Sequence, residues 1–186
     1  MDFGLRHSFW ALAAVAGAVV ALVWMGRVWW CEAGDWAVWS NQIESRHNSQ
    51  HPLDPYALTH LLHGILFYAA LHWTLGGRLG TSSRFALAVA AESFWEALEN
   101  TPMVIERYRE ATIAFGYYGD SVVNSLGDIL LCALGFLLAA RAPVRVSILA
   151  FLAIEAFLLL WIRDSLALNI LMLLWPLEAV RNWQTG

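Results

Sequence analysis

The sequence predicts an all-α membrane protein: a polytopic bundle of five to six transmembrane helices that forms one domain over residues 1–186. Hydrophobic residues make up 59% of the chain and charged residues only 14%, whereas about a quarter of a soluble domain is charged. The apolar residues also gather in segments close to the roughly 20 residues that a helix needs to cross a bilayer. The net charge is −4, and without a basic patch we expect no nucleic-acid partner.

The first predicted span covers residues 9–30. It resembles a signal peptide, but its apolar core is longer than the usual hydrophobic region and no small-residue cleavage site follows. We therefore expect an uncleaved helix. A polar loop over residues 31–56 comes next, where Pro52 and Pro55 argue against a continuous helix.

The later spans are separated by one short glycine-rich turn, one polar loop and one basic turn. The predicted spans cover residues 57–75, 84–100, 120–140 and 146–162. Residues 166–177 are apolar but shorter than a full crossing requires, and we interpret them as a short sixth span.

Arginines in the short loops predict the orientation. With a cytoplasmic amino terminus, one set of arginines faces the inside and is not interleaved with acids: Arg6, Arg78, Arg84, Arg141, Arg145 and Arg181. Those on the outer side lie among acidic residues: Arg27, Arg46, Arg107, Arg109 and Arg163. The positive-inside tendency then favours a cytoplasmic amino terminus, with the long polar loops on the outer side.

The cysteines and the loop histidines predict little chemistry. Cys31 follows the first span and Cys132 lies inside a later one, so their different depths argue against a structural disulfide, and their spacing gives no metal signal. His47 and His51 lie in the first polar loop, where we expect them to be solvated, with a cover over the site as the alternative for His51.

Ionisable residues at the ends of three apolar segments form the candidate site. A charge in hydrocarbon costs several kcal/mol, so such residues need a partner, a cavity or an ion. Each set repeats with helical spacing and therefore shares one helix face. The topology brings all three to the outer half of the bilayer: His60 and His63; Glu92, Glu96 and Glu99; Asp120, Asn124 and Asp128.

A divalent metal (Zn, Mn or Fe) is the sharper interpretation of this cluster, because imidazole and carboxylate are ligands of such ions in helical bundles. The expected ligands are His60, His63, Glu92, Glu96, Asp120 and Asp128. Asn124 and Asn100 would support them by hydrogen bonds. A purely structural polar network and a proton or ion path are the alternatives.

Several sequence blocks resemble an uncharacterised family of bacterial polytopic inner-membrane proteins. They stand, in order, as Asn48-Ser-Gln-His51, Asp54-Pro-Tyr56, Thr59-His-x-x-His-Gly64, Glu96-x-x-Glu-Asn-Thr-Pro102, Arg107-Tyr-Arg109 and Gly119-Asp-Ser-Val-x-Asn-Ser125. The resemblance runs from about Asn48 to Pro143 and implies a bacterial inner-membrane location and the helical fold, without an activity. The pattern of acids, arginines and Asp120-x-x-x-Asn124 is also distantly similar to VanZ-like membrane proteins.

The leading functional hypothesis is a membrane-embedded, metal-dependent enzyme acting on a lipid or lipid-linked envelope substrate. The ion would activate a water or a substrate oxygen, Glu99 would act as a general base, and Arg107 and Arg109 would pair with a substrate phosphate. Two alternatives stay open: a non-enzymatic accessory subunit of a larger complex with partner membrane proteins, and a small ion-coupled transporter. Membrane lipids are expected partners in every case.

Overall fold

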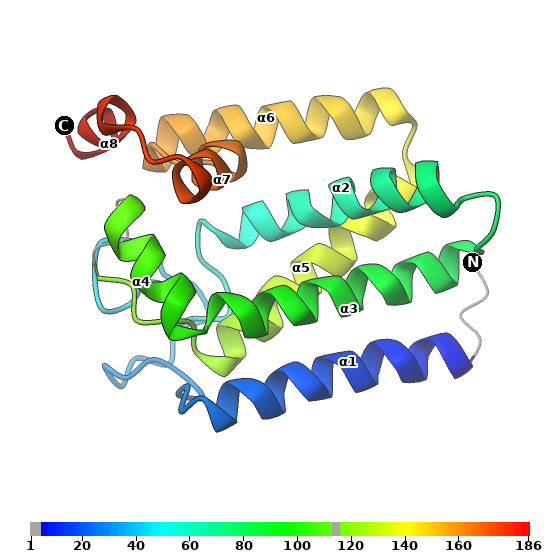
Figure 1. The fold of residues 1–186 in the computed structure, drawn as a ribbon, viewed down its shortest axis with the longest axis horizontal. Coiled ribbons are helices and arrows are strands. Elements are labelled where there is room, and N and C mark those ends of the chain that lie inside the picture. Colours follow the sequence, from blue (N-terminus) through cyan, green and yellow to red (C-terminus); the bar gives the residue numbers. More distant parts are fainter. Residues whose placement is uncertain (1–4, 113–115) are drawn as a thin grey trace.

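The computed structural model describes residues 5–112 and 116–186, and every regular element within these ranges is a helix. Five long helices lie roughly side by side (Figure 1): α1 (Leu5–Trp24), α2 (Ala57–Leu75), α3 (Thr81–Glu99), α5 (Val122–Arg141) and α6 (Val144–Ile162). Three short helices gather at one end of this bundle: α4 (Pro102–Ala111), α7 (Leu166–Leu174) and α8 (Glu178–Thr185). The predicted all-α fold is confirmed.

Three of the long helices, α1, α5 and α6, are long and apolar enough to cross a membrane. Helices α2 and α3 have 19 residues each and pack among them, but they carry the ionisable residues of the candidate site. The expected number of spans is compatible with this arrangement. Large apolar side chains on α6 point outward, with Leu160 87% exposed and Leu149 66% exposed, as expected for a surface that meets lipid rather than water.

Close packing of α2 against α5 depends on glycine. A Cβ atom on Gly64 would overlap the backbone of Cys132, and one on Gly135 would overlap the carbonyl of Leu61. Small residues that let two backbones approach are typical of helix pairs in membranes. This contact sets the distance between the histidines of α2 and the acids of α5.

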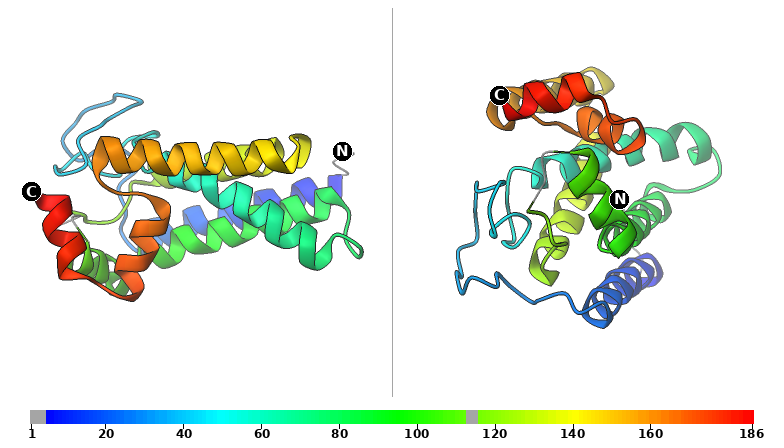
Figure 2. Two further views of the ribbon diagram at one scale, coloured as in Figure 1. Left: turned by 90° about the horizontal axis from the view of Figure 1, so that it is seen from above. Right: turned by 60° about the vertical axis from the view of Figure 1, so that its left-hand side comes forward.

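Helix α7 differs from the predicted sixth span. It has nine residues, which rise about 14 Å, less than half of the hydrocarbon thickness. Arg163 ends α6 in the left-handed region at φ 53°, and the Ser165 side chain caps α7. The chain therefore stays at the loop end of the bundle after α6 (Figure 2).

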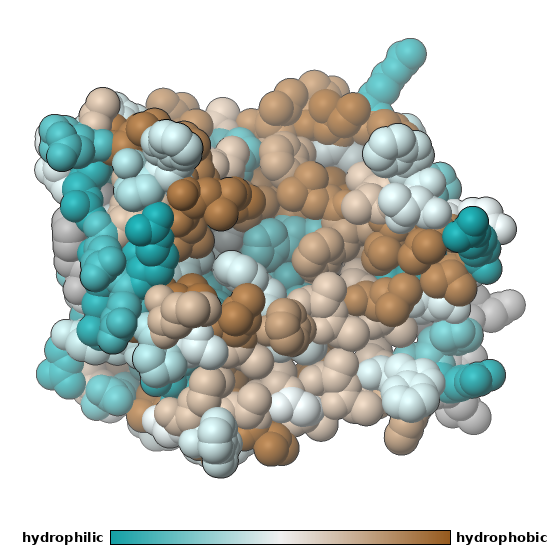
Figure 3. All heavy atoms as spheres, viewed as in Figure 1, coloured by the Kyte–Doolittle hydropathy of each residue, from teal (hydrophilic) through white to brown (hydrophobic). Residues whose placement is uncertain are grey.

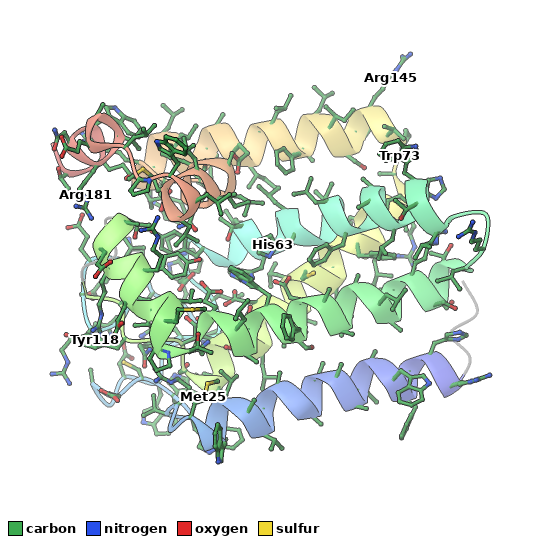
Figure 4. All side chains as sticks on the ribbon, viewed as in Figure 1. Met25, His63, Trp73, Tyr118, Arg145 and Arg181 are labelled. Atoms are coloured by element: carbon green, nitrogen blue, oxygen red, sulfur yellow. The ribbon has the colours of Figure 1, made fainter. Side chains whose placement is uncertain are left out.

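This path corrects the predicted position of Arg181. The sequence interpretation placed it with Arg145 on the cytoplasmic side, but the two lie at opposite ends of the molecule (Figure 4). The reason is that α7 is too short to return the chain across the bundle.

The loop between α1 and α2 is irregular but firmly attached. Its backbone accepts hydrogen bonds from the start of α5, with Ser121 N bonded to Ser49 O at 2.9 Å and Asn124 Nδ2 bonded to His51 O at 2.8 Å. His51 is completely buried, so the expectation that it is solvated is wrong. Because the loop packs onto the ends of α2 and α5, it forms a wall of the candidate site.

Candidate metal centre

The predicted cluster assembles where α2, α3 and α5 meet. His60 and His63 on α2 face Glu92 on α3, with both Nδ1 atoms directed at its carboxylate. The His60 Nδ1 to Glu92 Oε1 distance is 2.6 Å, and His63 Nδ1 lies 3.1 Å from each Glu92 oxygen. Glu92 is completely buried and is thus matched by two imidazoles.

Glu96 is as deeply buried as Glu92 but has no partner comparable to the two imidazoles. His60 Nδ1 lies 3.3 Å from Glu96 Oε1, but this nitrogen can carry only one hydrogen, and Glu92 lies closer. Neither Glu96 oxygen has a hydrogen-bond partner among the described residues, and neither does Oδ1 of Asp128 on α5. Asp128 Oδ2 is 3.9 Å from His60 Nε2. Buried polar atoms without partners are rare and costly, so this part of the cluster requires protons or a cation.

Asp120 continues the cluster toward the loop end. Its Oδ2 accepts a 2.6 Å hydrogen bond from Asn100 Nδ2, and its Oδ1 accepts one from the Tyr117 hydroxyl at 3.0 Å. Burial raises the pKa of Asp120, while the Asn100 and Tyr117 hydrogen bonds oppose this shift. Asn100 also accepts from Asp120 N at 2.7 Å. The structure thus places Asn100 in the supporting position that the sequence predicts.

A cavity of about 80 Å³ opens beside these residues, enough for several waters. Its polar lining includes His60, His63, Glu99, Asp120 and Asp128, while Leu166, Ile170 and Leu173 of α7 form an apolar wall. In Figure 3 hydrophilic atoms are visible in a hollow between hydrophobic ones, and Figure 4 shows His63 in the space between α2 and α3. A polar floor beside an apolar wall suits an amphiphilic ligand.

The two arginines of the predicted site lie elsewhere. Arg107 Nε donates to Leu173 O at 2.8 Å, and Arg109 Nε donates to Tyr117 O at 2.5 Å. The Arg109 guanidinium also lies over the Tyr118 ring. Neither arginine lines the cavity. Both attach α4 to neighbouring backbone, and Arg107 lies behind the wall that Leu173 forms.

Asn124 holds the loop between α1 and α2 in place. Its side chain holds His51 O, and its backbone N–H is capped by Ser121 Oγ at 3.2 Å. It therefore fixes the loop against α5. The sequence spacing placed it correctly on the face of Asp120 and Asp128.

Three residues of the site were not singled out from the sequence. Tyr108 hydrogen-bonds Glu99, and Tyr117 bonds Asp120. Asp54 caps α2 through Ala57 N at 3.1 Å, its Oδ2 is buried without a partner, and burial raises its pKa to about 7. An acid three residues before a helix start was the available signal for Asp54. The tyrosines come from another helix and a turn, which spacing alone does not connect to the site.

Three sets of ligand atoms lie close enough to hold an ion, and they adjoin one another. The three sets are His60, His63 and Glu92; His60, Glu96 and Asp128; and Glu96, Glu99 and Asp120. They share His60 and Glu96. All six predicted metal ligands and Glu99 therefore belong to one continuous cluster. Mixed imidazole and carboxylate donors fit Mn, Fe or Zn, and the unpartnered oxygens of Glu96 and Asp128 fit a bound cation.

Comparison with known proteins gives the family. The family described as "Protein of unknown function (DUF2585)" matches residues 22–186. The chain belongs to this family. The resemblance drawn from the sequence blocks is confirmed, and it extends beyond the predicted Asn48–Pro143 range into α1 and α6–α8.

Bacterial relatives match nearly the whole chain. A UPF0314 protein of Paracoccus denitrificans is 49% identical over 179 residues, covering 96% of this chain and 92% of the relative. One from Novosphingobium aromaticivorans is 52% identical over 172 residues, covering 90% and 87%. No solved structure matches the chain. The VanZ-like similarity stays a prediction.

Proposed function

We propose that this DUF2585 chain is a membrane-embedded, metal-dependent enzyme that acts on a lipid or lipid-linked substrate. The observation that carries the proposal is Glu96: a fully buried carboxylate whose oxygens find no hydrogen-bond partner in the part of the chain that the structure describes, set between His60, Asp128 and Asp120. An isolated buried charge costs far more free energy than one neutralised by an adjacent ion. A divalent cation held by His60, Glu96 and Asp128, whose ligand atoms lie within 4.8 Å of one another, satisfies these atoms together.

The cavity supports a substrate that is part polar and part apolar. Its wall of Leu166, Ile170 and Leu173 would take an acyl or prenyl chain, while the reacting ester group would lie over His63 and Asp120. When bound, the metal supplies Lewis-acid polarisation of a phosphoryl or carbonyl oxygen. Among envelope components, a lipid ester has both the apolar chain and the polar reacting group that this cavity would take.

Glu99 is the residue we assign as general base. It lines the cavity, lies beside Glu96 and Asp120, and is oriented by hydrogen bonds with Tyr108 and Trp95. In hydrolysis it would take one proton from the attacking water, whose oxygen bonds to the ester phosphorus or carbon. The ester bond to the leaving oxygen breaks, and protonated Glu99 returns the proton to that oxygen.

Metal analysis of detergent-purified protein tests the metal site. We expect bound divalent metal in the wild type and a loss of about one ion per chain in Glu96→Gln and in His60→Ala. His72→Ala is the matched control, because His72 lies on the same helix and bonds Arg84 at the far end of α2. Equal metal content in wild type, Glu96→Gln and His60→Ala would sink the proposal.

Turnover tests the enzyme assignment separately. Vesicles of total bacterial inner-membrane lipid, incubated with the protein and profiled by mass spectrometry, should lose one ester class. Glu99→Gln should keep its metal and slow this loss by about 10²–10⁴-fold, the range for a general base. Metal binding without any change in the lipid profile would favour the accessory or transport alternatives.

A further inference from the structure

A second cluster of ligand-type side chains lies in the loop between α1 and α2, outside the site described above. Cys31 Sγ is 3.4 Å from His47 Nδ1, which in turn is 3.2 Å from His51 Nε2. Asp35 Oδ2 lies 3.9 Å from His47 Nδ1 and 3.8 Å from His51 Nε2. The ligand atoms of Cys31, His47 and His51 thus lie within 4.8 Å of one another, and Asp35 Oδ2 lies within 4 Å of both imidazoles.

These separations match the edges of a tetrahedral zinc site. With Zn–N near 2.0–2.1 Å and Zn–S near 2.3 Å, two nitrogens are separated by roughly 3.3 Å and sulfur and nitrogen by roughly 3.5 Å. The His47–His51 and Cys31–His47 separations of 3.2 and 3.4 Å are close to these values. The longer distances to Asp35 need only a small movement of a half-exposed side chain.

Hydrogen bonds around the cluster prepare its atoms for a metal. His51 Nδ1 donates to Ala37 O at 2.8 Å, which leaves Nε2 with a free lone pair pointing at the cluster. Asp35 Oδ1 accepts from Ala37 N at 2.9 Å, so its other oxygen faces the imidazoles. Metal-bound histidines commonly have their second nitrogen held by a backbone carbonyl in this way.

We propose that Cys31, Asp35, His47 and His51 form a structural zinc site. The spacing Cys31-x₃-Asp35 followed by His47-x₃-His51 resembles the paired spacing of small zinc motifs, with a carboxylate in place of the second thiolate. Four protein ligands leave no open position, which is typical of a structural rather than a catalytic ion.

The site would fasten the loop that walls the main cavity. Asn48 and Ser49, adjacent to the ligand His47, line that cavity, and Gln50 Nε2 bonds Gly119 O at 2.9 Å. The loop from Met25 to Tyr56 contains no helix, and long irregular segments of this kind commonly need a function or a cross-link to stay ordered. A zinc ion supplies such a cross-link independently of the ion proposed at Glu96.

Cobalt substitution tests the site directly. Full-length protein in detergent, stripped with a chelator and loaded with Co²⁺, should show thiolate-to-cobalt charge-transfer absorption. The absorption should persist in Cys132→Ser and in Glu96→Gln and disappear in Cys31→Ser. Absence of the band in the wild type, or its loss in Cys132→Ser alone, would overturn the proposal, since Cys132 is the other cysteine and lies beside Glu92.

A second measurement needs no substitution at the site. Alkylation of Cys31 in the wild type, followed by peptide mass spectrometry, should be at least about tenfold slower with Zn²⁺ than after chelation, since a metal-bound thiolate is a poor nucleophile. Glu96→Gln should keep this protection even if it loses the central ion. Equal alkylation rates with and without Zn²⁺ contradict the proposal.

Discussion

Buried carboxylates in this protein differ in whether a hydrogen-bond donor reaches them. Glu155 on α6 accepts from the backbone N–H groups of Leu166 and Ala167 at 2.9 and 3.1 Å. Neither oxygen of Glu96 has a hydrogen-bond partner within residues 5–112 and 116–186. The first arrangement stabilises the start of α7 without further help, whereas the second requires a proton or a cation.

This difference predicts a metal-dependent stability that depends on Glu96. Mn²⁺ at about 100 times its dissociation constant should stabilise the wild type by about 2.7 kcal/mol, seen as a rise in Tm in detergent. Glu96→Gln should lose this rise, while Glu155→Gln should have a lower Tm but keep the rise. An equal rise in Glu96→Gln and wild type would contradict the assignment.

A pH dependence is expected from Asp164, between α6 and α7. Burial raises its pKa from 3.8 to about 6, opposed by hydrogen bonds from Ser165, Asn169 and Tyr56. The folded protein therefore binds this proton more tightly than the unfolded chain. The contribution to stability is fully present below about pH 4 and is lost as the pH rises through about 6.

The measurement is the unfolding free energy of wild type and Asp164→Asn in detergent from pH 3.5 to 8. Wild type should lose about 3 kcal/mol relative to the variant over this range. Parallel curves for the two proteins would show that Asp164 does not titrate in this way.

Helix packing explains why the predicted ligands meet. The sequence pattern correctly places His60, Glu92 and Asp128 on three helices and at one depth, because hydrophobic runs and i, i+4 spacing determine both. It does not place Arg107 or Arg109, since the segment predicted to be a polar loop folds into α4 and the direction of a long flexible side chain depends on tertiary contacts. The contact of Cys31 with His47, and that of His47 with His51, likewise depends on how an irregular loop folds.

The α2–α5 contact gives a prediction at this scale. Gly64→Ala or Gly135→Ala should force the two helices apart, because each added Cβ meets backbone atoms that cannot rotate away. The expected loss is about 1–3 kcal/mol, with weaker metal binding, since His60 would move away from Asp128. Stability and metal content are measured together.

Gly17→Ala on α1 is the control, because nothing lies within 4 Å of its added Cβ. It should be neutral or slightly stabilising, as alanine favours helix over glycine. Comparable losses in all three variants would show that general helix effects, not the close α2–α5 approach, are responsible.

Across the whole molecule, α7 determines the side on which the chain ends. Five long helices alternate in direction, and α7 and α8 then stay at the loop end, opposite the turn that contains Arg78 and the start of α6 with Arg145 (Figures 1 and 4). The sequence suggested a sixth crossing because residues 166–177 are apolar, but it does not reveal the left-handed Arg163 that turns the chain back. With Arg181 at the loop end, five arginines lie on the amino-terminal side and six on the other, so the cytoplasmic amino terminus stays a prediction that rests on the absence of acids among the first set.

We therefore expect the two termini on opposite sides of the membrane. A reporter active only outside the cytoplasm should work when fused after Gly186 and fail when fused within the turn at residues 76–80. Activity of both fusions, or of neither, would contradict the five-crossing arrangement. Activity of the turn fusion alone would contradict the cytoplasmic amino terminus.

The central claim is that an ion lies between His60, Glu96 and Asp128. An experimental structure of protein purified without chelator, with anomalous data collected on both sides of the Mn, Fe and Zn absorption edges, tests it most directly. We predict an anomalous peak about 2.0–2.3 Å from the ligand atoms of these residues. Glu96 and Asp128 sharing a proton or bonded to water, with no anomalous peak between them, would contradict it.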